Sequence, residues 1–257
     1  MPRFRATLSY DGTDFAGFQR QSAVRSVQGE VESALLKIAS QPVGVLGAGR
    51  TDSGVHASGQ VIAFDMDWAH PTDALQRALN ANLPADVVVA AVMETRADFH
   101  PRYDARSRRY RYQLAVRPQR NPLHDRYCVQ VWPPPDADVL RRLAGTIAGT
   151  HDFRGYGSAL DSGGSTVRTV LDANWREKET DDGLHLTFEI EANAFLYRMV
   201  RRLVGGMLRV AHGRWDEAMF EMILRGAGAT DVSPAAPAHG LILVAVRYAE
   251  DGSEDSG

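Results

Sequence analysis

Two segments of the chain alternate between apolar and polar residues, and this period of two constrains the fold more than any other feature. In residues 3–10, RFRATLSY, every second residue from Phe4 to Tyr10 is apolar, and residues 108–116, RRYRYQLAV, alternate from Arg109 onward. Because successive side chains of a strand point to opposite faces of its sheet, such segments form strands with one buried and one solvent-facing side. Strands of that kind are typical of antiparallel sheets.

Helical patterns lie between the strands. Ser26 can cap a helix in which Val27, Val31, Leu35 and Ile38 form one apolar stripe. We expect further helices at 73–81, 139–148, 194–211 and 216–224, and further strands at 60–64, 87–93, 168–175, 184–191 and 241–248. The mixture predicts an α+β protein of two similar halves, with largely antiparallel sheets flanked by helices.

The order of these elements also predicts how the chain is divided. We expect an N-terminal half over residues 1–105, a C-terminal half over 106–248, and an acidic tail over 249–257 that its composition predicts to be disordered. The proline run at 133–136 predicts a break, and the Ser/Gly-rich stretch 157–165 predicts a mobile loop.

Composition narrows the class of protein. At 257 residues and 44% hydrophobic, the chain can bury a sizeable core. The single cysteine, Cys128, excludes an internal disulfide framework and a Cys-rich metal cluster, which fits a reducing cytosol. The first residues form no apolar signal-peptide core, and the longest apolar run, 87–93, is too short to span a bilayer. We therefore expect a soluble cytoplasmic protein with no membrane contact.

Arginines are clustered although the net charge is only −3. Residues 96–126 hold nine arginines and three aspartates, and residues 198–214 hold five arginines and no acid. Such clusters are more often solvated faces than binding sites. A local positive field is nevertheless what a polyanion meets at close range, so the distribution also fits a nucleic-acid partner.

The stretch GAGRTDSGVHASGQ at 47–60 is the most unusual in the chain. It lacks the GK[ST] of a phosphate-binding loop, and no strand–GxGxxG–helix unit is present. Asp52 and His56 are four residues apart, a spacing that would suit metal binding from a helix, but the four glycines make a helix improbable there. The pattern therefore favours neither nucleotide nor metal binding.

Two interpretations of Asp52 stand side by side. T-D-S-G is good turn chemistry, so Asp52 can be a turn aspartate with Arg50 as its partner. Alternatively, a carboxylate on a loop beside a cation and near backbone N–H groups stays ionised and can act as a nucleophile or a base. The residues alone leave both open.

The strand at 108–116 also has two interpretations. Tyr110 and Tyr112 share one face, and Arg109 and Arg111 take the other. They can be core tyrosines with solvent-facing arginines, or a base-stacking tyrosine beside phosphate-binding arginines.

On the helix expected at 194–211, about 100° per residue places Arg198, Arg202 and Arg209 on one stripe, solvated or facing phosphate. Arg201 lies apart from them, at the edge of the apolar face. A buried arginine needs a carboxylate partner, and Asp52 is a candidate.

Many ordered motifs together make a family resemblance recognisable from the first strand to about Tyr248. They are Tyr10-Asp11-Gly12 with Phe15, Gly17 and Gln19; Gly49-Arg50-Thr51-Asp52 with Gly54, Val55, His56 and Gln60; Asn80 to Pro84; Asp98-Phe99-His100 to Arg102; Ala105 to Tyr112; Asn193-Ala194-Phe195 with Met199-Val200-Arg201 and Val204-Gly205; and Gly240-Leu241 with Leu243-Val244. In these motifs the chain closely resembles the tRNA pseudouridine synthase A family.

The resemblance implies a reaction and its setting. It implies isomerisation of uridine to pseudouridine at positions 38 to 40 in the anticodon arm of tRNA, with no cofactor, no nucleotide energy source and no catalytic metal. It also implies two α+β halves around a central active-site cleft, and a homodimer whose two subunits can touch one tRNA.

The resemblance further implies roles for single residues. Asp52 is the catalytic carboxylate, Tyr110 stacks on the target base, and Arg201 pairs with Asp52. Leu241 packs under the uracil, and Arg50 helps to hold the flipped nucleotide. The substrate-binding residues expected besides these are His56, Arg109 and Arg111. Two departures, Phe18 where tryptophan is common and the frame of residues 153–156, concern the substrate loops and not the reaction.

A non-catalytic, chaperone-like RNA-binding module is the competing class. It explains the arginine clusters equally well. It gives no reason for a carboxylate within a phosphate-binding cleft, where the negative charge would repel the ligand. A synthase needs the uridine out of its stack, and hence a cleft with a positive rim and an aromatic floor.

Overall fold

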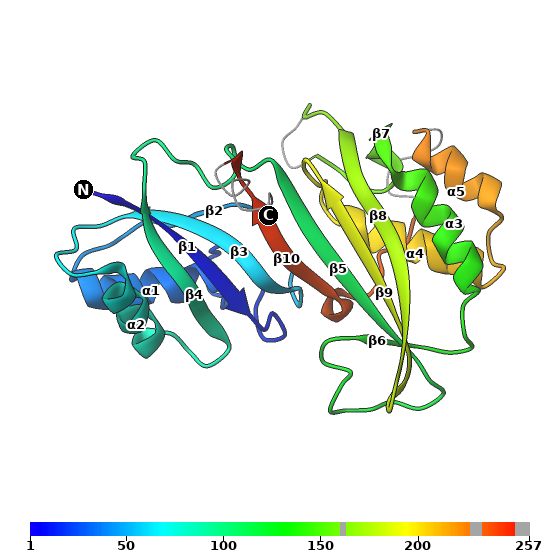
Figure 1. Ribbon diagram of the computed structural model, residues 1–257, viewed down its shortest axis with the longest axis horizontal. Helices are drawn as coiled ribbons and strands as arrows, with labels where there is room; N and C mark the ends of the chain where they lie inside the picture. The colour runs from blue at the N-terminus through cyan, green and yellow to red at the C-terminus, as the bar shows by residue number, and fades with distance from the viewer. Residues whose placement is uncertain (160–162, 227–232, 250–257) are drawn as a thin grey trace, which may run out of the picture. The chain divides into compact units, whose positions relative to one another are not determined.

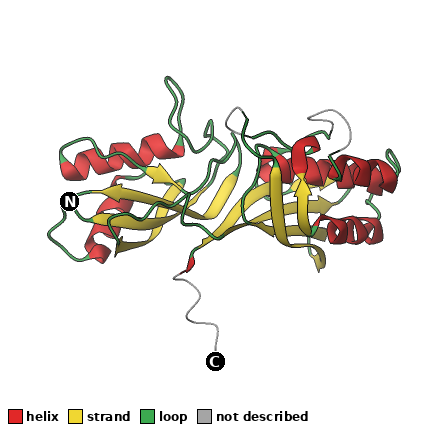
Figure 2. Cartoon of the chain, turned by 90° about the horizontal axis from the view of Figure 1, so that it is seen from above, coloured by secondary structure: helices red, strands yellow, loops and turns green. Residues whose placement is uncertain are grey.

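The computed structural model describes residues 1–159, 163–226 and 233–249 (Figure 1). The chain forms two compact units. Unit 1 comprises Met1–Arg106 together with the segment that begins at Ile242, and unit 2 comprises Ser107–Leu241. Both units combine a sheet with helices, as the strands and helices of Figure 2 show. The α+β class predicted from the sequence is confirmed.

The sheet of unit 1 has the strand order β4 (Val87–Thr95), β1 (Arg3–Tyr10), β3 (His56–Asp65), β10 (Leu241–Arg247). β1 is antiparallel to β3 and to β4, and the short β2 (Leu46–Gly47) is antiparallel to β3. β10 is parallel to β3, with Ile242 opposite His56. Two helices complete the unit, α1 (Val27–Ala39) and α2 (Thr72–Asn82), and α2 packs against both β4 and α1.

The first elements follow from the sequence pattern. In β1 the burial alternates along its whole length, with Phe4, Ala6, Leu8 and Tyr10 inside. Ser26 is the N-cap of α1 and its hydroxyl accepts a hydrogen bond from the Gly29 N–H, as predicted. The apolar stripe of α1 is buried except at its last position, Ile38, which is half-buried.

The sheet of unit 2 has the strand order β5 (Ser107–Val116), β9 (Gly183–Ala192), β8 (Val167–Thr180), β7 (Gly149–Asp152). These pairs are antiparallel, and β6 (Val129–Val131) is parallel to β5. The helices are α3 (Ala137–Ile147), α4 (Met199–Ala211) and α5 (Glu217–Leu224). α3 packs against β8 and α4, and two short 3₁₀ turns lie at Phe153–Gly155 and Ala238–Gly240.

The prediction for the arginine-bearing helix was wrong in two respects. The helix begins at Met199 and not near 194, because Arg198 takes a left-handed conformation with φ of 60° and acts as its N-cap. Arg198 therefore lies before the regular helix. Arg202 is buried, at 8% exposure, so Arg198, Arg202 and Arg209 form no solvent-facing stripe. The error at Arg198 arises from extending one helical wheel across a non-helical residue, whereas Arg202 lies inside the helix and is buried there.

The bounds predicted for the two halves and the tail stay predictions. The compact units assign the segment from Ile242 to unit 1, because Ile242 and Leu243 pair with β3. Residues 250–257 of the acidic tail and residues 160–162 of the Ser/Gly-rich loop lie outside the described residues. Within the described ranges, no helix is long and apolar enough to cross a membrane.

Ser26→Ala should lower the free energy of unfolding by about 1 kcal/mol, because the Gly29 N–H loses its side-chain acceptor. Ser33→Ala on the same helix is the control: its exposed hydroxyl only donates back to the Gly29 carbonyl, so a change within about 0.5 kcal/mol is expected. Urea unfolding of the two variants measures the difference. Equal midpoints would show that the cap does not stabilise α1.

Candidate active site

The loop that carries Asp52 connects β2 to β3 and spans residues 48–55; we call it the Asp52 loop. The Ala48 N–H donates to the Val61 carbonyl (2.8 Å), which extends the β2–β3 pairing to the start of the loop. At its other end the Val55 N–H donates to the Asp52 carbonyl (3.1 Å), and Gly54 has φ of 77°. Asp52 is therefore the first residue of a tight turn, which confirms the turn predicted from T-D-S-G.

The middle of the loop is fixed from inside unit 1. Thr51 is buried, and its hydroxyl lies 2.8 Å from the Tyr10 hydroxyl. The Gln60 side-chain amide donates to the Gly49 carbonyl (2.9 Å), and the Phe18 N–H donates to the Thr51 carbonyl (3.1 Å). The neighbours of Thr51 on either side are accessible, since Arg50 is exposed and Asp52 is half-buried.

Residues 10–18, YDGTDFAGF, form the surface against which the loop rests; we call them the Tyr10 segment. A Cβ atom on Gly12 would lie 2.0 Å from the Val55 carbonyl oxygen, and one on Gly17 would lie 2.7 Å from the Thr51 carbonyl oxygen. Gly17 also has φ of 113°. Both positions need glycine, because the two backbones approach more closely than any side chain allows.

His56, the first residue of β3, joins the same two segments. Its side chain is buried, and the Gly12 N–H donates to its Nδ1 (2.9 Å). The Asp11 carboxylate approaches the same nitrogen to 3.1 Å. His56 thus has a positioning contact inside unit 1, and its predicted role toward the substrate stays a prediction.

In unit 2, Tyr110 lies on β5 at the margin of the core, with 9% exposure. Its ring packs edge-to-face against Phe195, with ring centroids 4.9 Å apart. Tyr112, two residues on, is fully buried, and its hydroxyl donates to the Pro237 carbonyl (2.8 Å). Burial raises the pKa of Tyr112, so it remains a neutral donor. The shared face predicted for the two tyrosines is confirmed.

The arginines that alternate with these tyrosines, Arg109 and Arg111, are paired with carboxylates across the sheet. The Arg109 Nε donates to Glu191 (2.9 Å), and the Arg111 Nη2 donates to Glu189 (2.7 Å). Both pairs follow the β5–β9 register, which places Arg109 opposite Glu191 and Arg111 opposite Glu189. Both arginine side chains are part-exposed, and each is paired with a glutamate. Their predicted phosphate contacts stay predictions.

Arg201 and Leu241 complete the predicted set. Arg201 lies in the first turn of α4 and is half-buried; its Nε donates to the Ala236 carbonyl (2.8 Å). Leu241 is buried and begins β10, one residue before Ile242, which pairs with His56. The carboxylate partner predicted for Arg201 stays a prediction.

The structure thus gathers the predicted residues into two groups. Arg50, Asp52 and His56 belong to one loop of unit 1 and the strand that follows it, and Arg109, Tyr110 and Arg111 belong to one strand of unit 2. No role was predicted from the sequence for the residues that support these groups, which are Tyr10, Thr51, Gln60 and Phe195. One feature of the sequence could have indicated Tyr10: it is the residue with a polar hydroxyl on an otherwise apolar face of β1.

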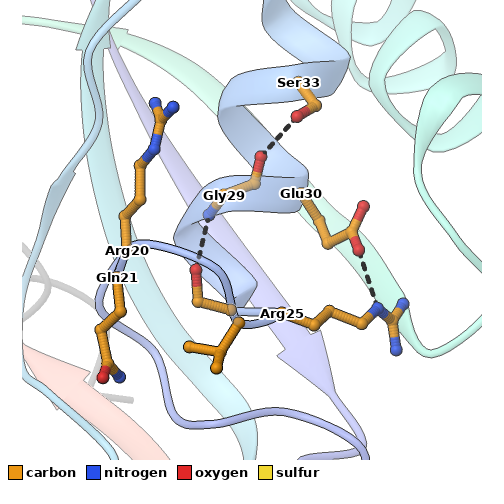
Figure 3. A pocket seen from close by; sticks show the side chains of 8 residues that line it. Arg20, Gln21, Arg25, Gly29, Glu30 and Ser33 are labelled. Carbon is orange, nitrogen blue, oxygen red and sulfur yellow. Dashed lines mark hydrogen bonds and ion pairs between the residues drawn. The ribbon is translucent and has the colours of Figure 1, made fainter.

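A pocket within unit 1 lies at the N-terminal turn of α1, lined by Arg20, Gln21, Val24, Arg25, Ser26, Gly29, Glu30 and Ser33 (Figure 3). Arg25 pairs there with Glu30 (2.7 Å) and with Asp86 (2.6 Å), and Arg20 pairs with Glu32 (2.8 Å). The arginines of the pocket are therefore neutralised locally. Among the described residues, no group of three His, Cys, Asp or Glu side chains could hold a metal ion.

Comparison with known proteins identifies relatives over nearly the whole chain. A family model described as tRNA pseudouridine synthase matches residues 6–104 and 143–249. The tRNA pseudouridine synthase A of Halalkalibacterium halodurans is 40% identical over 244 residues, covering 94% of this chain and 91% of that protein. The tRNA pseudouridine synthase A of Streptococcus pneumoniae serotype 19F is 39% identical over 251 residues, covering 97% of this chain and 100% of that protein.

Gly12→Ala should lower the free energy of unfolding by about 1–3 kcal/mol, because the new Cβ overlaps the Val55 carbonyl and pushes the Asp52 loop away. Gly44→Ala is the control, since no neighbouring atom lies within 4 Å of its Cβ position, and a change within about 0.5 kcal/mol is expected. Urea midpoints measure both variants. A Gly12→Ala protein as stable as Gly44→Ala would contradict the close approach.

Proposed function

The chain belongs to the tRNA pseudouridine synthase family and is therefore an isomerase of uridine in tRNA, and we propose that it acts at positions 38 to 40 of the anticodon arm with Asp52 as its catalytic carboxylate. The observation that carries this proposal is the Asp52 loop itself. Thr51, between Arg50 and Asp52, is fixed by two hydrogen bonds, to the Tyr10 hydroxyl and from the Phe18 N–H, and Gly49 is fixed by the Gln60 amide, while Arg50 and Asp52 remain accessible.

The proposed reaction conserves every atom of the nucleoside. The N-glycosidic bond to N1 of uracil breaks, the base turns, and a bond forms between C1′ and C5. The proton on C5 leaves and N1 gains a proton, so no oxidant, reductant or cofactor is required. Covalent attack by the Asp52 carboxylate, on the base or on the sugar, divides one difficult step into easier ones.

The other predicted residues have roles that suit a flipped nucleotide. A base can react only after it has left its stack, and unstacking it costs about 2–4 kcal/mol. Tyr110 stacks on the target base, Leu241 packs under the uracil, and Arg50 holds the flipped nucleotide. Arg201 pairs with the Asp52 carboxylate. The edge-to-face contact with Phe195 supports the Tyr110 assignment, because it fixes the plane in which a base would stack.

The proposed setting is the cytoplasm, with tRNA as partner, a homodimer as the working form, and neither metal nor cofactor. The arginine pairs bear on the competing, non-catalytic RNA-binding interpretation. That interpretation rested on the arginine clusters, and Arg109 and Arg111 are each balanced by a glutamate. No observation favours it over the enzyme.

Asp52→Asn tests the catalytic assignment. The amide is nearly isosteric and can still accept hydrogen bonds, so the melting temperature should stay close to that of the unchanged protein. Binding to tRNA should persist, since phosphate contacts elsewhere supply most of the affinity. Pseudouridine formation should fall by at least about a thousandfold, because a neutral amide cannot attack as a carboxylate does.

The matched control is Asp67→Asn, at an exposed position after β3, for which full activity is expected. Pseudouridine content of unmodified tRNA after incubation measures both variants. Substantial activity in Asp52→Asn, or a lower melting temperature with normal activity per folded molecule, would show that Asp52 is only a turn residue.

The arginine pairs on β5 test the RNA-binding surface. If Arg109 and Arg111 meet phosphates, replacing both by alanine should weaken tRNA binding and reduce the slope of log K against log salt by about 0.7–0.9 for each lost contact. Glu189→Gln should act in the opposite direction, because it releases Arg111 from its carboxylate. Affinity titrations across a salt series measure both effects. An unchanged slope in the alanine variant would place these arginines away from the RNA.

A further inference from the structure

Three buried polar side chains form a connected chain beneath the Asp52 loop. They are Tyr10 at the end of β1, Thr51 in the loop, and Gln60 in β3, with exposures of 4%, 7% and 0%. The Tyr10 hydroxyl lies 2.8 Å from the Thr51 hydroxyl, and a side-chain hydrogen bond also connects it to Gln60. The Gln60 amide in turn donates to the Gly49 carbonyl (2.9 Å). We call these three residues the polar chain.

The polar chain joins the loop to the sheet on both sides of Arg50. Thr51 is connected to Tyr10, and Gly49 is connected to Gln60, so the backbone before and after Arg50 is tied to two neighbouring strands. Thr51 is also the residue directly before Asp52. A rotation of Thr51 out of its buried position would therefore move the Asp52 carboxylate with it.

Packing alone does not require this chemistry. The other inward residues of β1, Phe4, Ala6 and Leu8, are apolar, and phenylalanine in place of Tyr10 would bury the same ring. Buried polar groups cost stability unless every one finds a partner, and a fully satisfied network specifies one arrangement. The Tyr10 hydroxyl, which packing does not need, therefore restricts the Asp52 loop to one position.

Tyr10 is not a proton donor or acceptor in the reaction. Burial raises its pKa to about 12, although hydrogen bonds with Thr51 and Gln60 act to lower it. The hydroxyl stays neutral at any physiological pH, and its ring is enclosed in unit 1. Its contribution is a fixed hydrogen bond.

We propose that Tyr10, acting through Thr51 and Gln60, is a positioning residue that holds the Asp52 carboxylate in its reactive orientation. The inference rests on the proposed function, since it assigns the support of the same carboxylate. It predicts that loss of a single buried hydroxyl affects turnover more than stability or tRNA binding. Small misplacements of a reacting group can reduce a rate by about a hundredfold.

Tyr10→Phe and Thr51→Val each remove one hydroxyl and keep the shape of the side chain. Each should lower kcat for pseudouridine formation by about tenfold or more, with the KM for tRNA within about threefold of its original value. Thr51→Ser restores the hydroxyl and should stay within about twofold in kcat. The double variant Tyr10→Phe, Thr51→Val should be no slower than the slower single variant, because both remove the same connection.

Tyr248→Phe is the matched control. Tyr248 is buried in unit 1, and its hydroxyl donates to the Pro101 carbonyl (2.7 Å), away from the Asp52 loop. It should lose as much melting temperature as Tyr10→Phe while keeping its kcat. Equal kcat values in the two variants, or a rise in KM with kcat unchanged, would overturn the positioning role.

Amide hydrogen exchange separates this inference from the proposed function. The Phe18 and Val55 amides bond to the Thr51 and Asp52 carbonyls, so both should exchange faster in Tyr10→Phe and remain slow in Tyr248→Phe. If the protein without substitutions forms no pseudouridine, the proposed function is overturned. The exchange pattern still decides whether the polar chain orders the Asp52 loop. Equal exchange in the two variants would overturn the inference.

Discussion

The antiparallel pairing of β1 with β3 is the constraint on which the candidate site depends. It places Tyr10, the last residue of β1, opposite Ala57, near the first residue of β3. The Tyr10 segment, which follows β1, and the Asp52 loop, which precedes β3, therefore leave the sheet at the same end. Gly12 and Gly17 let their backbones touch, and the hydroxyl of Tyr10 connects them. The position of Asp52 is thus a consequence of strand register.

Patterns of short period were sufficient to predict most elements of the fold. Residues 3–10 form a strand with the predicted bounds, and Ser26 caps its helix, because both depend on neighbours in sequence. The strands β2, β6 and β7 hold two to four residues each, too few for a period of two to be visible. The helix predicted from 194 begins later, since the left-handed Arg198 interrupts the pattern.

The residues of the candidate site could be recognised in the sequence, but the contacts that hold them in place could not. The sequence drew attention to Arg50 and Asp52 through glycine-rich turn chemistry, and the turn is present. It gave no sign that Thr51 would bond to a residue 41 positions earlier. The arginines of 108–116 were similarly judged without their partners, because Glu189 and Glu191 come from β9. Local arginine density therefore overstates the positive charge that a ligand meets on β5.

The most direct measurement of the central claim follows the hydrogen on C5 of the target uridine. Conversion to pseudouridine replaces that hydrogen by the bond to C1′, so tRNA labelled with tritium at C5 of its uridines reports the reaction itself. The account predicts that the protein alone, without added cofactor, releases tritium to water, in proportion to the pseudouridine that appears at positions 38 to 40. Stable binding of the labelled tRNA with no release of tritium would contradict it.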